Sequence, residues 1–316
     1  MLSFVIPCYR SAKTVGGVVD EIRETCRRLE SVGDAYEVIL VNDGSGDDTW
    51  ETIRQLAESD AHIRSYDLAR NFGQHAALMA GLARTKGDIV ICLDDDGQTP
   101  ADEAGKLIEA VNAGADVAYA RYASKKHSLF RNFGSFLNEK MAGAMLGKPK
   151  ELTVSSYFAA RRFVIDEVLR YEGPYPYLIG LVLRSTNRIV NVEVNHRRRE
   201  VGQSGYTLPK LIGLWMNGFT AFSIKPLRAA TLAGSLFAIL GFAYGIYTVI
   251  KKFVIPDVPV GFSALMSAVM FIGGMLMLML GMIGEYLGRL YISQNRNPQY
   301  VIRDFAGDTG AESTDA

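Results

Sequence analysis

Two long uncharged runs constrain this chain more than any other feature of its sequence. Residues 229–250 carry no charged side chain over 22 positions, and residues 261–284 carry none over 24. As helices, at about 1.5 Å per residue, the runs would measure roughly 33 to 36 Å, which is enough to cross a hydrocarbon core of about 30 Å. We therefore predict transmembrane helices over 229–250 and 262–284, joined by a short loop over 251–261.

Charge indicates which side of the membrane the rest of the chain occupies. Its 34 Lys and Arg balance 34 Asp and Glu, so a general nucleic-acid binder is disfavoured. Lys251 and Lys252 lie in the predicted loop, and the residues that flank the other ends are more numerous: Lys225, Arg228, Arg289, Arg296 and Arg303. This excess predicts a multi-pass protein of the inner (cytoplasmic) membrane, with a cytoplasmic N-terminal domain and a cytoplasmic tail over 285–316. No basic segment or cleavage site begins the chain, so we expect no removed signal peptide.

The N-terminal part reads as an α/β domain. Apolar runs without alternation (LSFVIP, YEVILVND, IRSYDL and DIVICLDDD) are separated by stretches with helical periodicity near 14–31, 49–59 and 75–85. Strands of this kind are typical of a parallel sheet covered on both faces. We predict a Rossmann-like fold, in which ligands bind at the carboxyl ends of the strands. No G-x-G-x-x-G follows the first run, which disfavours a dinucleotide oxidoreductase.

The triplet Asp94–Asp96 carries the clearest chemistry. Three carboxylates at the end of a buried strand raise one another's pKa unless a cation neutralises them, and oxygen ligands suit Mg²⁺ or Mn²⁺. In an extended segment Asp94, Asp96 and Gln98 project to one side, so these three are the expected metal ligands. The alternative is an acidic turn that only caps the following helix.

An ordered series of motifs resembles a known family. VIPCY, VNDGS, ARNFGQHAALMAG and LDDDGQTP, in that order, resemble the GT-A glycosyltransferases of family 2. FRNFGS, RREVGQSGYT, KPLR and GEYLGRLY are similar to the polyisoprenyl-phosphate glycosyltransferases of that family, which include dolichol-phosphate mannose synthases and the GtrB and ArnC types. The resemblance implies a cytoplasmic GT-A domain over 1–206, an interfacial amphipathic helix region over 207–228 and the two membrane helices. It implies inverting transfer of a single sugar from a nucleotide sugar to polyprenyl (undecaprenyl) phosphate, for cell-envelope glycans.

The resemblance also assigns residues to a nucleotide-sugar donor, expected to be uridine-linked. Pro7, Tyr9 and Asp43 would hold the base and ribose, with Asn71 and Gly73 lining the same cleft. The other donor positions that it implies are Asp94, Asp95, Arg199, Ser204 and Tyr206. From the residues alone, Asp43 could instead belong to a turn beside a helix cap, and the basic residues 197–199 could bind lipid headgroups.

Arg121, Arg131 and Ser135 match the positions that hold the acceptor phosphate in the family, and with Asp96 they are the expected catalytic residues. Guanidinium groups suit phosphate geometry, although a solvated basic face is the alternative. The segment 152–158 lacks the acidic residue that relatives carry as a candidate base. A lipid phosphate, with a second pKa of about 6, is already a nucleophile at neutral pH.

Two departures from the family pattern and two rival functions bear on the activity. Tyr9-Arg10-Ser11 replaces the usual Tyr-Asn-Glu, and Ser204-Gly205-Tyr206 replaces Ser-Lys-Tyr. A processive polysaccharide synthase would be expected to have a Q-x-x-R-W motif and more spans, neither of which is found, and a catalytically silent scaffold is the other alternative. The apolar spacing over 207–224 suits an interfacial helix or a core-packing helix equally, and a homo-oligomer is left open.

Overall fold

The computed structural model describes residues 1–29, 35–122, 151–174, 176–195, 225–254, 261–294 and 297–307. Two compact units make up the chain: a head, Met1–Gly205 with Arg296–Ala316, and a second unit, Tyr206–Asn295. The interfacial region expected over 207–224 lies outside the described residues.

The described part of the head contains one mixed eight-stranded sheet, of order β7-β5-β6-β4-β1-β2-β3-β8. Its strands are β1 (Leu2–Cys8), β2 (Tyr36–Asn42), β3 (Ile63–Leu68), β4 (Ile89–Cys92), β5 (Val117–Tyr122), β6 (Phe158–Arg161), β7 (Ile189–Val194) and β8 (Ile302–Ala306). β1 pairs in parallel with β2 and β4, as do β2 with β3 and β5 with β7. β6 is antiparallel to both β4 and β5, and β8 is antiparallel to β3.

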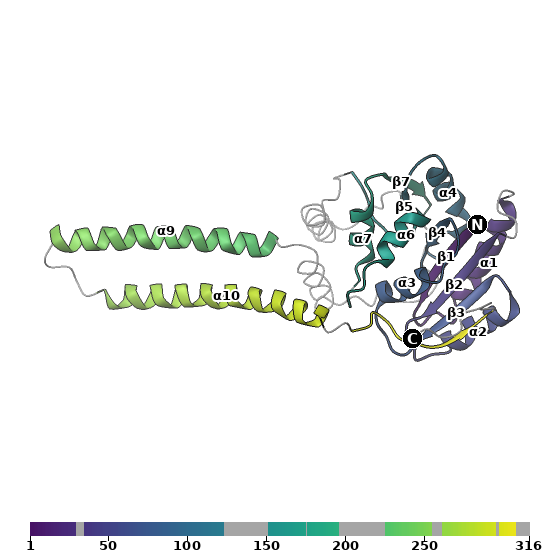
Figure 1. Cartoon of the computed structure of the whole chain (residues 1–316), viewed down its shortest axis with the longest axis horizontal. Coiled ribbons are helices and arrows are strands. Elements are labelled where there is room, and N and C mark those ends of the chain that lie inside the picture. The colour runs from purple at the N-terminus through teal and green to yellow at the C-terminus, as the bar shows by residue number, and fades with distance from the viewer. Residues whose placement is uncertain are drawn as a thin grey trace. The chain divides into compact units, whose positions relative to one another are not determined.

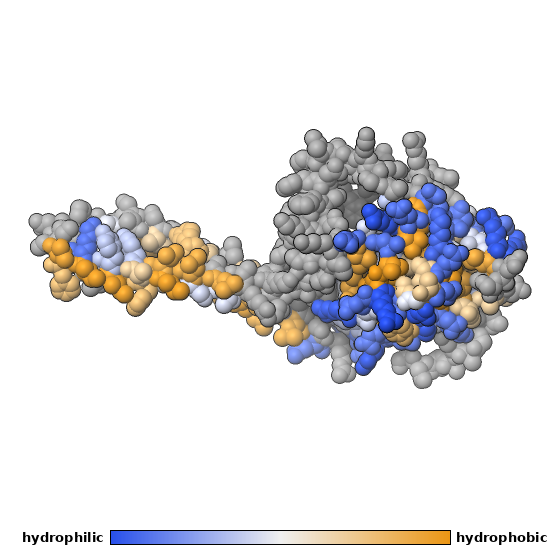
Figure 2. Space-filling view, turned by 90° about the horizontal axis from the view of Figure 1, so that it is seen from above, coloured by the Kyte–Doolittle hydropathy of each residue, from blue (hydrophilic) through white to orange (hydrophobic). Residues whose placement is uncertain are grey.

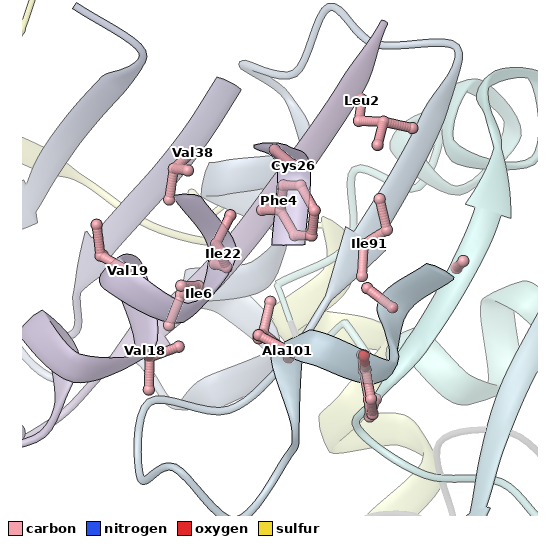
Figure 3. Close-up of a cluster of buried hydrophobic side chains, with 14 of the residues drawn as sticks. Leu2, Phe4, Ile6, Val18, Val19, Ile22, Cys26, Val38, Ile91 and Ala101 are labelled. Carbon is pink, nitrogen blue, oxygen red and sulfur yellow. The ribbon is translucent and has the colours of Figure 1, made fainter. Parts of the chain in front are cut away.

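Helices cover both faces of the sheet, as Figure 1 shows. They are α1 (Val15–Arg28), α2 (Thr49–Ser59), α3 (Gln74–Leu82), the 3₁₀ turn η1 (Ala101–Glu103), α4 (Ala104–Asn112), α6 (Arg162–Leu169) and α7 (Leu178–Ser185). Side chains alternate along each strand, so Phe4 and Ile6 of β1 pack with α1, α2 and α4, whereas Val5 packs with α3, α6 and α7. Figure 3 shows the first of these layers, where Ile22 and Cys26 of α1 lie over β1. The predicted α/β fold is confirmed.

The C-terminal segment differs from the tail expected over 285–316. The second long helix continues to Gln294, and Ile302–Ala306 then joins the head sheet as β8. Ladder bonds from β8 satisfy backbone groups of β3 that would otherwise form a sheet edge. A five-residue strand with charges at Arg303 and Asp304 has too weak a pattern to be predicted locally.

The second unit contains two long helices, α9 (Lys225–Val254) and α10 (Phe262–Gln294). Among the described residues, the windows Ala230–Tyr247 and Phe271–Gly288 are long and apolar enough to cross a membrane, and neither is buried within the protein. Figure 2 shows apolar side chains, in orange, along much of the face of these helices that is in view. Phe237 packs edge-on against Phe271 with ring centroids 5.5 Å apart. The two predicted helices are therefore present, and each extends beyond its expected bounds.

Candidate active site

Three strand ends meet at the carboxyl edge of the head sheet. β1 and β2 are in register at Cys8 and Asn42, and the Asp43 N–H donates to the Cys8 carbonyl at 2.9 Å. The backbone N–H of Tyr9 donates to Asp95 Oδ2 at 2.9 Å, and that of Arg10 donates to Ser45 Oγ at 3.0 Å. The segments that follow β1, β2 and β4 are thus joined directly by hydrogen bonds.

Asp43 holds the loop that follows β3. Its carboxylate accepts from the backbone N–H of Phe72 at 2.7 Å and of Gly73 at 2.9 Å, while the Asn71 side chain donates to the Asp43 carbonyl at 3.2 Å. Burial raises the pKa of Asp43, and the two N–H groups oppose that rise. The structure therefore brings the expected residues Asp43, Asn71 and Gly73 together, but it gives the carboxylate loop N–H groups as partners.

Two glycines allow this close packing of loops. Gly44 has φ +60, and a Cβ there would lie 2.3 Å from the Arg70 carbonyl carbon. Gly73, with φ +94, is the N-cap of α3 and has a conformation that other residues adopt only with strain. Any side chain at Gly44 would push the loop after β2 away from the loop after β3.

Asp94 lies between two hydrogen-bond donors from distant segments. Gln74 Nε2 donates to its Oδ1 at 3.0 Å, and Ser156 Oγ donates to its Oδ2 at 2.5 Å. Burial raises the pKa of Asp94 to about 6; the Ser156 bond lowers it, and the charges of Asp96 and Asp95 raise it. Asp94 is thus a carboxylate whose ionised form is costly without further positive charge.

The other two carboxylates have different partners. Burial raises the pKa of Asp95, and the hydrogen bond from the Tyr9 N–H opposes the rise. Asp96 accepts from the Gln98 backbone N–H at 3.0 Å and from Gln98 Nε2 at 2.8 Å. Gln98, expected as a metal ligand, therefore acts as a donor that orients Asp96, and only its Oε1 atom could also face a cation.

The donor set fits a divalent cation bound with its substrate. Among the described residues, no Lys or Arg forms an ion pair with Asp94 or Asp95, and the pKa of each is raised. The same part of the chain holds no cluster of three or more His, Cys, Asp or Glu arranged for a metal. Mg²⁺ and Mn²⁺ commonly take only one or two protein carboxylates and complete their shell with water and substrate phosphates. Asp94 and Asp96 match that pattern.

The remaining expected residues differ in position and in exposure. Pro7 is buried inside β1 in register with Val41, whereas Tyr9 is 47% exposed. Arg121 is exposed near the end of β5, beside Tyr122, whose pKa is raised by burial and by the charges of Asp94 and Asp96. The expected residues outside the described part of the chain are Arg131, Ser135, Arg199, Ser204 and Tyr206.

Three neighbours of the carboxylates were not expected from the sequence: Gln74, Ser156 and Tyr122. Gln74 directly follows Gly73 in the motif, which is a local signal, but Ser156 is 62 positions from Asp94 and has none. His75 packs edge-on against Tyr177, with ring centroids 5.2 Å apart, and burial lowers its pKa to about 4. This buried environment is typical of a packing residue.

Comparisons with known proteins match both units. Residues 3–169 match the model of "Glycosyl transferase family 2", and residues 225–290 match that of the "GtrB C-terminal hairpin". The undecaprenyl-phosphate 4-deoxy-4-formamido-L-arabinose transferases of Yersinia pestis (strain Angola) and Yersinia pseudotuberculosis (strain YPIII) are each 33% identical over 99% of this chain and 95% of the relative. The likeness therefore extends through the head, the hairpin and the returning segment.

A solved structure shares the architecture of the head. Glucosyl-3-phosphoglycerate synthase from Mycobacterium tuberculosis, crystallised with Mn²⁺, uridine diphosphate and phosphoglyceric acid, aligns with a TM-score of 0.50. It is 19% identical, and the alignment covers 70% of this chain and 76% of that one. At this identity the likeness concerns the fold alone.

Proposed function

The chain belongs to glycosyl transferase family 2, and from that premise we propose that it transfers a single sugar from a nucleotide donor to undecaprenyl phosphate at the cytoplasmic membrane. One observation carries the proposal: the identity to undecaprenyl-phosphate sugar transferases runs through 99% of the chain, including the hairpin. Two long apolar helices that are not buried in the protein would be unfavourable in water, so they argue against a soluble transferase.

In this proposal the donor binds over the carboxyl ends of β1, β2 and β4. Asp94 and Asp96 hold a divalent cation, Mg²⁺ or Mn²⁺, which when bound neutralises charge on the leaving diphosphate. Asp95 accepts from the backbone N–H of Tyr9, and Asp43 accepts from that of Gly73. The exposed Tyr9 ring, with the Arg10 guanidinium 5.4 Å from its centroid, would stack on the base. Use of a uridine donor is supported only by the family motifs. Arg199, Ser204 and Tyr206 belong to the same donor proposal.

The acceptor phosphate needs no protein base in this scheme. A monoester with a second pKa of about 6 is largely dianionic at neutral pH, so its oxygen can attack the anomeric carbon without losing a proton. Position and charge compensation are what the protein must supply, and Arg121, Arg131 and Ser135 are the proposed phosphate contacts. A single in-line displacement inverts the anomeric configuration.

Transfer is tested with the purified full chain, undecaprenyl phosphate and a panel of labelled nucleotide sugars, by counting label extracted into butanol. We expect one sugar per lipid, and activity lost in EDTA and restored by Mn²⁺ or Mg²⁺. Label in a polymer rather than a single-sugar lipid would favour a processive synthase. No transfer with any donor, while nucleotide still binds, would favour a silent scaffold.

The acceptor assignment has its own test. Arg131→Ala should lower kcat/KM for undecaprenyl phosphate by about 10² or more, because a lost charged hydrogen bond costs about 1.5 to 3 kcal/mol and misplacement adds to it. Donor affinity should stay within a few fold, and Arg131→Lys should rescue only partly. Equal loss of donor binding and lipid turnover would contradict the assignment.

Membrane attachment is tested by carbonate extraction. Two spanning helices expose far more apolar surface than a peripheral helix, so the full chain should remain with the pellet. Recovery of most of the protein in the supernatant would contradict the two spans.

A further inference from the structure

The carboxylate of Asp94 is held from both sides by side chains that are remote in sequence. Gln74, at the first position of α3, reaches Oδ1, and Ser156, two residues before β6, reaches Oδ2. Asp96 accepts hydrogen bonds from the backbone N–H and from Nε2 of Gln98, two residues away. The orientation of Asp94 thus depends on the tertiary fold.

The antiparallel course of β6 accounts for the Ser156 contact. β4 and β6 pair with Cys92 opposite Phe158, and continuing that register by two residues sets Asp94 opposite Ser156. Residues directly opposite on antiparallel strands lie close enough for side chains to touch. A parallel strand at this place in the sheet would not bring Ser156 to Asp94 in this register.

The segment that carries Ser156 is itself firmly held. Tyr157 is fully buried and its hydroxyl donates to the Pro100 carbonyl at 3.0 Å. Ser155 Oγ donates to the Tyr157 carbonyl at 2.8 Å and accepts from the Tyr157 N–H at 3.1 Å. Ser155 and Ser156 are therefore adjacent hydroxyls with separate tasks: one closes a turn and the other contacts Asp94.

Each carboxylate oxygen has two acceptor sites, so one bond from Ser156 and one from Gln74 still leave a site on each oxygen. Two donors at opposite oxygens also restrict rotation of the carboxylate. Outer hydrogen bonds of this kind, which orient a metal-binding carboxylate, commonly change metal affinity or activity 10- to 100-fold when they are removed.

We propose that Ser156 and Gln74 are positioning residues that orient Asp94 for the divalent cation bound with the nucleotide donor. The inference rests on the proposed function, since it assumes that Asp94 and Asp96 hold that cation. It assigns a role to the segment 152–158: Ser156 supplies a hydroxyl that orients the carboxylate on the neighbouring strand.

The test measures Mn²⁺ affinity of the solubilised full chain, by the electron paramagnetic resonance signal of free Mn²⁺, with uridine diphosphate present. Ser156→Ala should weaken Mn²⁺ binding by about 10-fold or more, and Ser156→Thr, which keeps the hydroxyl, should restore most of it. Gln74→Ala should weaken binding in the same direction. Ser155→Ala, the matched control, should lower the thermal midpoint and leave Mn²⁺ affinity within about 2-fold.

The outcomes distinguish the positioning role of Ser156 and Gln74 from the proposed metal-binding role of Asp94 and Asp96. If Asp96→Ala loses Mn²⁺ but Ser156→Ala and Gln74→Ala bind it normally, the positioning role is wrong and the metal role stands. If Asp96→Ala also binds Mn²⁺ normally, the metal role itself is wrong. Should Ser156→Ala fail to fold, Gln74→Ala, which approaches Asp94 from the other side, decides the matter.

Discussion

Carboxylates are buried at both the amino and the carboxyl ends of the parallel strands of the head sheet. They differ in whether a cationic side chain is paired with them. At the amino end, Glu37 of β2 accepts from the Arg64 guanidinium, from Ser3 Oγ at 2.5 Å and from the Lys86 N–H at 2.6 Å. The Glu37 and Arg64 side chains are only 8% and 7% exposed. At the carboxyl end, Asp94 and Asp95 are bonded by neutral donors, and the described residues include no cation paired with either.

We interpret this difference as one between a carboxylate that stabilises the fold and carboxylates that we propose to act in ligand binding. A buried charge with a matched cation is satisfied within the protein, and removing either partner leaves the other stranded. Crowded carboxylates without such a partner cost stability in the absence of ligand, which is typical of functional sites. The four predictions below test this contrast, from the largest expected effect to the smallest.

Asp96→Ala should leave the fold intact and abolish most activity. It removes a proposed ligand where charge develops on the leaving diphosphate, so we expect a rate loss on the order of 10² to 10⁴. Turnover of labelled donor measures the loss, and the thermal midpoint of the metal-free protein checks the fold. A near-normal rate would show that Asp96 is not a metal ligand.

Arg64→Met should have the converse result. It leaves the buried Glu37 carboxylate without its cationic partner, which typically costs about 3–5 kcal/mol of unfolding free energy. The thermal midpoint should fall markedly while Mn²⁺ affinity of the folded fraction stays unchanged. The double variant with Glu37→Gln serves as control and should recover part of the loss; a drop in Mn²⁺ affinity instead would mean that the two ends are coupled.

Asp94→Asn should stabilise the metal-free protein at pH 7.5, by up to about 3 kcal/mol. The native pKa, about 6, lies above the ordinary value of 3.8, so between these values the native state binds more protons than the unfolded state. Stability of the wild type therefore rises as pH falls from above 6 towards 4, and the variant lacks this rise. Thermal midpoints at pH 7.5 and 5 measure the difference, and saturating Mn²⁺ should reverse its sign. A variant less stable than wild type at pH 7.5 would contradict the contrast.

His75→Phe should remove an acid sensitivity of about 1 kcal/mol near pH 5.5. Burial lowers the pKa of His75 from 6.5 to about 4, so the unfolded state binds the proton first and stability is lost as pH falls through this window. Comparing the wild-type and variant midpoints at pH 7.5 and 5.5 isolates this group from Asp94, which acts in the opposite direction. Equal acid losses in both proteins would show that the imidazole is not the cause.

Local patterns predicted more of the fold than of the site. Periodicity located the helix Thr49–Ser59, and the length of the charge-free runs located both long apolar helices, because both signals lie within one segment. The family membership inferred from the ordered motifs is confirmed. The antiparallel β6, the returning β8 and the Ser156 contact were not predicted, since each depends on pairing between distant segments. The metal-binding role of Asp94 and Asp96 stays a prediction.

The returning strand β8 also determines when the head can be completed during synthesis. Arg303 of β8 donates to the Ala69 carbonyl, just after β3, across 234 positions of chain. At about 5–20 residues per second, a ribosome needs on the order of 10 to 50 s to make the intervening chain. For that time β3 is an uncovered edge while both apolar helices emerge. The apolar hairpin is therefore made before the head sheet can close, and until then the open edge of β3 exposes backbone groups that can pair with other chains.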